Sequence, residues 1–417
     1  MIVRSLISLF IVAISMSTLC GQKEDFQWVF GDRYVTFPPI YYGSVVDFNK
    51  SPVEVEGRLD GIESFNGSNT AISSKDGHLL FYTNGVQIYD RRHQLMENGD
   101  TLSPTEVTFS LIDQEEGSGI EQSVLVLPWP DRDSIYFLMH HNTPYRYSTD
   151  EAPEYELLYS IVDMRENGGY GAVTSKNELI LEDSLSVGHI TSCRHANGRD
   201  WWILVRKTGP YSGYHRFLLD PEGLHHKGIQ QIGLEIDPIF RGQAKFSPDG
   251  SRYAFMYFIE SQDTLYIDLY NFDRCTGQLS DLRKLQYGAK YSGVLGPGHG
   301  FSFSPNSRYL YASSTYRIHQ FDLESSHISG SKKIVREQED NEHTCLKFYD
   351  FDVEFHELQL APNGKIYISG IKYCVLSEIK YPDRNGAACD VDLNTLRIKN
   401  FAIRSIPDFP HFRLGPL

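Results

Sequence analysis

Lys245-Phe246-Ser247-Pro248-Asp249-Gly250 joins a short apolar run to a second apolar run through a turn of Ser, Pro, Asp and Gly. Proline fixes φ at the first turn position, and glycine or asparagine accepts a positive φ, so the phrase predicts a hairpin turn between two strands. Related phrases occur elsewhere in the chain: Ala71-Ile72-Ser73-Ser74-Lys75-Asp76-Gly77, Ser302-Phe303-Ser304-Pro305-Asn306 and Gln359-Leu360-Ala361-Pro362-Asn363-Gly364. The sequence therefore predicts a series of similar hairpins.

The spacing of these hairpins indicates a β-propeller. A lone hairpin cannot bury its apolar face, and self-similarity at a period of about 40 to 60 residues is typical of blades that pack on their neighbours. The 26 Tyr and 24 Phe among the 417 residues also favour an all-β class. Repeats of about four strands each can be counted from residue 69 onward. We therefore expect an all-β fold, a propeller of six or seven four-stranded blades.

The residues outside the counted repeats leave the number of blades open. The segment 28–48 precedes the first repeat, and the segment 401–412 follows the last one. Either the two ends combine into a seventh blade, or one of them supplies an outer strand that closes a six-bladed ring. Counting repeats favours six blades, and the spare strands favour seven.

The start of the chain has the pattern of an export signal, residues 1–21. Arg4 supplies a positive charge, residues 6–14 form an apolar run too short to span a bilayer, and small residues follow. We expect cleavage after Cys20 or Gly21. Lipidation of Cys20 is disfavoured because Leu19 stands where a small residue is required. Residues 22–417 then form a single propeller domain that is secreted, held at the cell surface, or periplasmic.

The charge of the chain argues against two classes of partner. Its 39 Lys and Arg residues are outnumbered by 54 Asp and Glu residues, which gives a net charge of −15. The sequence holds no Lys/Arg cluster of the kind that neutralises phosphates, so we expect no nucleic acid partner. After the export signal, no segment approaches the roughly twenty apolar residues of a membrane helix, so we expect no membrane insertion.

Five cysteines follow the predicted export signal: Cys193, Cys275, Cys345, Cys374 and Cys389. In an oxidising compartment Cys374 and Cys389 are the most plausible disulfide, closing a loop at the end of the last repeat. Spacing alone does not determine the connectivity. Cys193 and Cys275 lie in apolar strand contexts and are expected to be buried thiols.

Several motifs together carry a resemblance to a known family. They occur in this order: Trp28-Val29-Phe30-Gly31, Asp76-Gly77-His78-Leu79-Leu80-Phe81-Tyr82-Thr83-Asn84-Gly85, Tyr159-Ser160-Ile161-Val162-Asp163-Met164 with Asn167-Gly168-Gly169, His195-Ala196-Asn197-Gly198 and Pro407-Asp408-Phe409. This order resembles the amino-terminal propeller of gliding-motility and type IX secretion-associated surface proteins. The Phe-Ser-Pro-Asp-Gly phrases alone are also similar to the propeller repeats of the Tol-Pal periplasmic protein and of archaeal surface-layer proteins.

The resemblance implies a secreted or surface-displayed propeller, and it transfers no catalytic residues. In that family the propeller is usually followed by immunoglobulin-like repeats and a carboxy-terminal sorting module. This sequence departs from the pattern, since it stops at Leu417 immediately after the last repeat. That departure puts covalent surface display in doubt.

The candidate binding residues lie where the innermost strand of each blade is expected to start, because these positions face one mouth of the central channel. Counting back six to eight positions from each turn gives the channel-mouth candidates Glu121, His189, Gln243, His299, His356 and Glu357, together with Asn69 and Gln122. A ring of such side chains could hold a divalent cation such as calcium, or bind a sugar or peptide through hydrogen bonds. It could equally well satisfy exposed strand ends and hold channel waters.

Two functions from different classes remain after these observations. The first is a binding or scaffold module at the cell exterior, with a surface protein or glycan as its partner and no cofactor. The second is a metal-dependent hydrolase of the lactonase or esterase kind, with Glu121, His299 and Glu357 around a channel cation. Motifs such as Gly-x-Ser-x-Gly and His-Glu-x-x-His are absent from the sequence. We therefore expect binding rather than catalysis.

Overall fold

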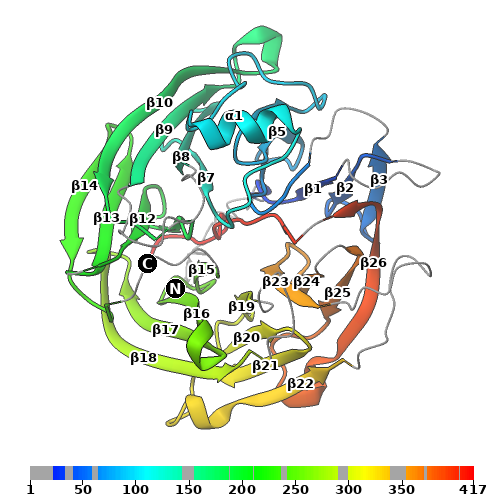
Figure 1. Cartoon of the computed structure of the whole chain (residues 1–417), viewed down its shortest axis with the longest axis vertical. Coiled ribbons are helices and arrows are strands. Elements are labelled where there is room, and N and C mark those ends of the chain that lie inside the picture. The colour runs from blue at the N-terminus through cyan, green and yellow to red at the C-terminus, as the bar shows by residue number, and fades with distance from the viewer. Residues whose placement is uncertain are drawn as a thin grey trace, which may run out of the picture.

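The computed structural model describes residues 22–32, 41–58, 64–142, 155–186, 188–209, 211–235, 242–289, 299–338, 354–370, 373–402 and 404–417. Seven antiparallel sheets stand around a central axis, and the chain visits them in sequence order (Figure 1). The protein is thus an all-β, seven-bladed propeller. The fold class is confirmed, and seven is the correct choice between the two predicted blade numbers.

Two of the blades have three strands each among the described residues. Their strands are β1 Gln27–Gly31, β2 Gly43–Asp47, β3 Glu54–Arg58, and β4 Thr70–Ser73, β5 Leu79–Thr83, β6 Ile88–Asp90. The third and fourth blades contain β7 Val124–Pro128, β8 Ile135–His141, β9 Tyr155–Asp163, β10 Ala172–Asp183, and β11 Thr191–Arg194, β12 Trp201–Lys207, β13 Gly213–Asp220, β14 Gly223–Gln230.

The last three blades have the predicted four strands each. The fifth and sixth blades contain β15 Ala244–Phe246, β16 Arg252–Ile259, β17 Thr264–Asp273, β18 Gln278–Gly288, and β19 Phe301–Phe303, β20 Tyr309–Ser314, β21 Arg317–Asp322, β22 Lys333–Glu337. The seventh contains β23 Phe355–Leu360, β24 Ile366–Gly370, β25 Tyr373–Ile379 and β26 Val391–Ala402. One α-helix, α1 Glu106–Asp113, and the short 3-10 turns η1 Asn167–Gly169, η2 Glu260–Gln262, η3 Ser329–Ser331 and η4 Gly386–Cys389 complete the described elements.

The predicted hairpin turns are present in all four repeated phrases. In each turn the fourth residue donates its backbone N–H to the carbonyl of the first residue: Gly77 to Ser74, Gly250 to Ser247, Ser307 to Ser304 and Gly364 to Ala361, at 2.8 to 3.0 Å. These fourth residues have left-handed φ values of +88°, +71°, +60° and +78°. Glycine adopts such a φ without a steric cost, which is why it recurs at this position.

The two ends of the chain do not share a blade. Residues 27–58 form the first blade by themselves, and it meets the seventh blade through side chains at β26 and β2. There the hydroxyl of Ser44 donates to the Asn400 side chain at 2.5 Å and accepts from the Lys399 N–H at 2.8 Å. The six-bladed arrangement is therefore wrong. The C-terminal segment pairs with no sheet among the described strands, but it packs beside the first blade, where Phe409 stacks on Trp28 and Arg413 pairs with Asp25.

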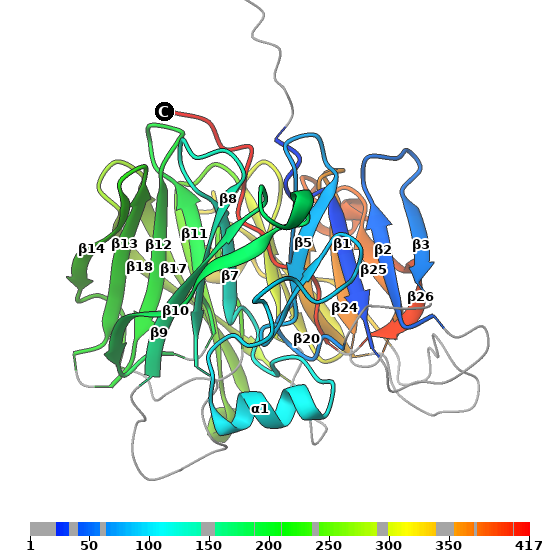
Figure 2. The same ribbon diagram turned by 90° about the horizontal axis from the view of Figure 1, so that it is seen from above.

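The C-terminal segment, residues 404–417, runs along the centre of the ring (Figure 2). It leaves β26 and reaches the face of the ring opposite the face on which α1 lies. We call the two ends of the channel the helix end, where the innermost strands begin and near which α1 lies, and the turn end, where the hairpin turns at residues 74–77, 247–250, 304–307 and 361–364 lie.

The core consists of apolar layers between blades. One layer joins Phe301 and Phe303 of the sixth blade to Leu265 and Ile267 of the fifth, all of them buried. Trp28 closes the ring, since its indole packs on Phe48 of its own blade, on Tyr367 of the seventh blade and on Phe409 of the C-terminal segment, with ring centroids 4.8, 5.8 and 6.1 Å apart. Each blade is therefore stabilised mainly by its neighbours.

The predicted disulfide between Cys374 and Cys389 is wrong. Cys389 is a buried free thiol, whereas Cys374 is disulfide-bonded, so the two do not pair with each other. The two lie on opposite faces of the seventh blade: Cys374 packs in the apolar layer shared with the first blade, and Cys389 in the layer shared with the sixth. Cys193 is a buried thiol as predicted, whereas Cys275 is exposed, because it lies in the turn between β17 and β18.

No helix in the described part of the chain has the length and apolar character needed to cross a membrane. The predicted export signal, residues 1–21, lies outside the described residues.

Candidate site in the central channel

The predicted channel-mouth residues lie together at the helix end of the channel. Glu121 and Gln122 precede β7, and the other candidates precede or begin the innermost strands of other blades: Asn69, His189, Gln243, His299, His356 and Glu357. All of them are buried, with exposed fractions of 5% or less. The residues reached by counting back from the turns therefore lie at the starts of the innermost strands, and their role in binding stays a prediction. The count gave no information on which side chains touch one another.

Three of these side chains converge. Glu121, His299 and His356 each offer one donor atom, and the three atoms lie within 4.8 Å of one another. His299 Nε2 is 3.3 Å from Glu121 Oε1, and the rings of His299 and His356 meet edge to face with centroids 4.4 Å apart. Burial alone would raise the pKa of Glu121, but its hydrogen bond and charge interaction with His299 outweigh burial and hold that pKa below its usual range.

Glu357 lies beside this group and has the opposite electrostatic character. Burial, and then the negative charge of Glu121, raise the pKa of Glu357 well above its usual range. One of its oxygens, Oε2, accepts the backbone N–H of Ile406 at 2.9 Å. Glu357 therefore contacts the C-terminal segment directly, and its burial beside Glu121 favours the protonated form of its carboxyl group.

The remaining candidates support neighbouring strands. Gln243 Oε1 accepts the N–H of Phe301 at 3.0 Å, and Asn69 Nδ2 donates to the carbonyl of Val29 at 2.9 Å. His189 Nδ1 lies 3.1 Å from the Ser186 hydroxyl, and its ring packs on Phe255 with centroids 4.7 Å apart. These contacts satisfy strand ends, as one of the interpretations of the sequence expected.

The C-terminal segment places one carboxylate in the middle of the channel. Asp408 accepts from Lys245 Nζ at 2.8 Å and from Gln122 Nε2 at 2.8 Å, and its N–H donates to the carbonyl of Asn69 at 3.1 Å. Lys245 also donates to Gln359 across the channel. Lys245 and Asp408 have side-chain exposures of 11% and 15%, so this is a largely buried ion pair that joins the segment to several blades.

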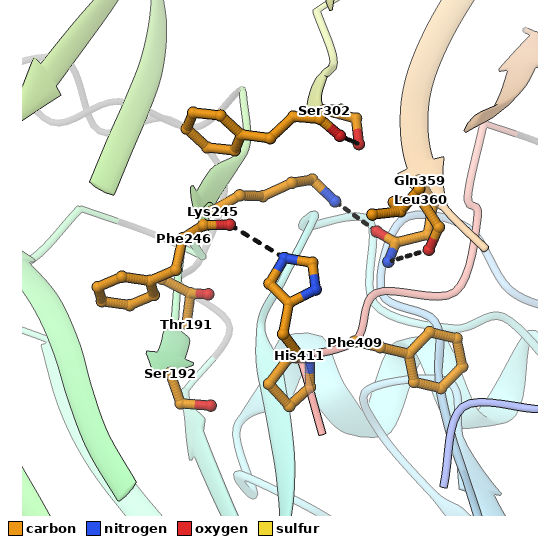
Figure 3. Close-up of a pocket in the computed structure, with 11 residues that line it drawn as sticks. Thr191, Ser192, Lys245, Phe246, Ser302, Gln359, Leu360, Phe409 and His411 are labelled. Atoms are coloured by element: carbon orange, nitrogen blue, oxygen red, sulfur yellow. Dashed lines mark hydrogen bonds between the residues drawn. The ribbon is translucent and has the colours of Figure 1, made fainter. Parts of the chain in front are cut away.

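A small cavity follows Asp408 towards the turn end (Figure 3). His411 Nε2 lies 3.1 Å from the carbonyl oxygen of Phe246, and Lys245 and Gln359 meet on the opposite wall. Hydroxyl groups of Thr191, Ser192 and Ser302 also line the cavity. The cavity thus combines polar groups from four blades with the C-terminal segment.

At the turn end the surface opens into a shallow basin, which we call the turn-lined mouth. It is formed by the turns of the last three blades and by the C-terminal segment, and its lining residues are Pro248, Pro305, Leu360, Ala361, Pro362, Gly364, His411, Arg413, Leu414 and Gly415. Pro248, Pro305 and Pro362 are each partly exposed. The surface of the basin is therefore mixed: proline, leucine and alanine supply most of its side chains, and polar groups are exposed beside them at least as much as apolar ones.

The C-terminal segment is fixed on both sides of this basin. Arg413 makes two parallel hydrogen bonds to the carboxylate of Asp25, at 2.6 and 2.7 Å. The Leu417 N–H donates to the carbonyl of Ala196 at 3.0 Å, and Phe412 packs on Trp201 with ring centroids 5.8 Å apart. Paired hydrogen bonds of the Arg413 type fix both position and orientation.

Comparisons with known proteins find only distant likenesses among solved structures. No family model matches the chain, and no curated protein matches it. Among solved structures, a candidate 6-phosphogluconolactonase from Bacteroides fragilis has 12% sequence identity and a TM-score of 0.46, over 94% of this chain and 99% of that one.

Two further solved structures are similar at the same level. A candidate 6-phosphogluconolactonase from Bacteroides uniformis has 13% identity and a TM-score of 0.45, over 92% of this chain and 98% of that one. A protein from Lactobacillus plantarum has 11% identity and a TM-score of 0.43, over 91% and 98%. Likeness at this level carries no information on activity. The resemblance of the sequence to gliding-motility proteins stays a prediction.

Proposed function

We propose that the protein is a binding module of the cell exterior that recognises a protein partner at the turn-lined mouth. The observation that carries the proposal is the course of the C-terminal segment. Because this segment runs along the channel and is hydrogen-bonded to Glu357, Asn69 and Phe246, the chain itself occupies the place where a small substrate would enter. The turn-lined mouth is the concave surface that remains available at that end.

The chemistry of the basin favours a polypeptide over a glycan. Its proline, leucine and alanine side chains offer apolar contact area, and the polar groups exposed beside them can pair with the backbone of an extended chain. Recognition of sugars at such a site would require flat aromatic faces or a dense set of hydrogen-bonding groups. Here Arg413 is already paired with Asp25, and His411 with Phe246. An extended apolar segment of a partner protein matches this surface better.

The setting of this interaction is also a proposal. The pattern of residues 1–21 supports export, and the family resemblance implies a role beside gliding-motility or type IX secretion components. A partner in that setting would be a surface or periplasmic protein. The acidic exterior, with its net charge of −15, is compatible with such a role and keeps a large exported protein soluble.

Site-specific photocrosslinking tests the proposal. A photoreactive residue at Asn306 or at Asn363, two exposed turn positions beside the basin, should crosslink one and the same protein in the envelope fraction of the source cells. The same label at Ser110, exposed on α1 at the helix end, is the matched control. We expect the crosslink from both turn positions, its loss in Leu414→Ser, and none from Ser110. Crosslinks from Ser110 alone, or glycan-array binding that Leu414→Ser abolishes, would contradict the proposal.

The hydrolase alternative has one observation in its favour, which is the convergence of Glu121, His299 and His356. Glu357, which the sequence suggested as a catalytic group, is instead bonded to Ile406 of the C-terminal segment. A screen with lactones and esters, in the presence of zinc or calcium, distinguishes the two functions. Turnover that is lost in Glu121→Gln would favour the hydrolase, and its absence leaves the binding module as the better account.

A further inference from the structure

We propose that Glu121, His299 and His356 form a binding site for a zinc-class transition-metal ion at the helix end of the channel. The inference is independent of the binding role proposed above, since it concerns the opposite end of the channel. It rests on the geometry of three buried side chains and on the backbone that holds them.

The spacing of the donor atoms is one that a shared ion also requires. His299 Nε2 and Glu121 Oε1 are 3.3 Å apart, which is long for a hydrogen bond, since most N–H···O hydrogen bonds are about 2.7 to 3.2 Å long. Two donors that share a tetrahedral zinc at about 2.0 to 2.1 Å lie about 3.3 Å from each other. The donor atom of His356 lies within 4.8 Å of both, so only small side-chain movements are needed for all three to reach one ion.

The type of donor selects the metal. Two imidazoles and one carboxylate are a ligand set that zinc uses with a water or another ligand in its fourth position. Calcium prefers six to eight oxygen ligands, and this group supplies one carboxylate among two nitrogen donors. The calcium ion considered from the sequence therefore suits this group less well than zinc does.

The backbone around the two histidines is fixed independently of any ion. The hydroxyl of Ser313 donates to the carbonyl of His356 at 2.6 Å and accepts the N–H of Gly300 at 2.9 Å. A Cβ on Gly300 would lie 2.4 Å from the Cα of Glu357, so only glycine allows β19 and β23 to approach this closely. The histidines that precede Gly300 and Glu357 are thus held facing each other.

The site would connect the third blade to the adjacent sixth and seventh blades across the channel. Glu121 belongs to the third blade, His299 to the sixth and His356 to the seventh. An ion bound to all three would link opposite walls of the channel, and it would compensate the charge of the buried Glu121 carboxylate. Because binding to the folded state alone stabilises that state, zinc should raise the unfolding midpoint.

The test uses the full mature chain after treatment with a chelator. Zinc titration by calorimetry, followed by metal analysis, should give one zinc per chain, and cobalt substituted for zinc should show the intense visible absorption of a tetrahedral site. In His356→Asn and Glu121→Gln we expect zinc affinity to fall by at least about 100-fold, since loss of outer-shell partners alone costs 10- to 100-fold. His189→Asn removes a channel histidine outside the group and should bind zinc as the wild type does.

Several outcomes would overturn the proposal. One is a wild-type chain that binds no stoichiometric zinc, and another is unchanged affinity in His356→Asn. Tighter binding of calcium than of zinc would also overturn it. The pair His215 and His226, whose ring nitrogens lie 3.1 Å apart beside Asp183, is the competing candidate. Loss of stoichiometric zinc in His226→Asn, with binding retained in His356→Asn, would assign the ion to that pair. Circular dichroism on every variant separates loss of binding from loss of fold.

Discussion

Replacement of Gly250 by alanine tests the contact between the turn of the fifth blade and the C-terminal segment. Gly250 has a φ of +71°, and an added Cβ would lie 2.7 Å from Leu414 Cδ2, 2.7 Å from Arg274 Cδ and 3.0 Å from Cys193 Sγ. The left-handed φ alone costs a non-glycine residue about 1 kcal/mol. Overpacking adds about 1 to 3 kcal/mol, so we expect Gly250→Ala to destabilise the protein by about 2 to 4 kcal/mol.

Gly364 is the matched control for this change. It occupies the same position of the same turn in the seventh blade, with a φ of +78°, but an added Cβ would meet no atom within 4 Å. Gly364→Ala should therefore cost only the backbone strain, about 1 kcal/mol. The difference between the two variants measures the packing of the C-terminal segment against the turn.

Urea unfolding followed by tryptophan fluorescence gives the two free energies of unfolding. In the double variant Gly250→Ala, Leu414→Ala, the methyl group added at residue 250 meets a smaller neighbour. The double variant should therefore lose at least about 0.5 kcal/mol less free energy of unfolding than the two single variants lose in sum. If Gly250→Ala and Gly364→Ala lowered the free energy of unfolding equally, the predicted contact with Leu414 and Arg274 would be refuted. Losses near zero in both variants would refute the left-handed turn itself.

Three other predictions concern the channel and the thiols. Asp408→Asn leaves the Lys245 ammonium without its carboxylate, so we expect the free energy of unfolding to fall by about 3 kcal/mol and to recover in part in Lys245→Met, Asp408→Asn; an unchanged urea midpoint would refute the ion pair. Burial lowers the pKa of His140 to about 3 and of His141 to about 4, so NMR should find both rings neutral at pH 5. In the unfolded chain both histidines take up protons near pH 6.5, whereas in the folded protein they do not. For each ring the free energy of unfolding should therefore fall by up to about 1.4 kcal/mol per pH unit as the pH falls from 6.5 towards 4; rings that titrate near 6.5 would contradict this. Iodoacetamide should modify Cys275 in the native protein but reach Cys193 and Cys389 only after unfolding, since both are buried and burial raises the pKa of Cys193 to about 12; rapid native labelling of Cys193 would contradict its packing.

The repeated turns could be predicted because their chemistry is local. Proline at one position and glycine at a positive φ fix the hairpin wherever the phrase occurs, and the innermost strand starts a few residues before the turn. Counting back from the turns therefore located Glu121, His299 and His356 at the channel. The first blade could not be predicted as a repeat because residues 22–58 contain no Ser-Pro-Asp-Gly phrase.

The rest of the channel depends on contacts between residues far apart in sequence. Asp408 meets Gln122 and Lys245 only because seven blades close into a ring, and nothing in the local pattern of residues 404–417 indicates this. Pro407 and Pro410 cannot donate to a strand ladder, and this was the one available sign that the segment does not complete a blade. The cysteine pairing failed for a similar reason, since residues close in sequence lie on opposite faces of one sheet.

Hydrogen exchange of residues 404–417 tests most directly whether the C-terminal segment occupies the channel. The backbone N–H groups of Ile406, Asp408 and Leu417 are bonded to Glu357, Asn69 and Ala196 respectively. Mass spectrometry should therefore find this segment protected in the native protein, and Asp408→Asn should weaken the protection. Exchange of these amides at the rate of an unstructured peptide would show that the segment lies outside the channel, and would remove the basis for a partner site at the turn-lined mouth.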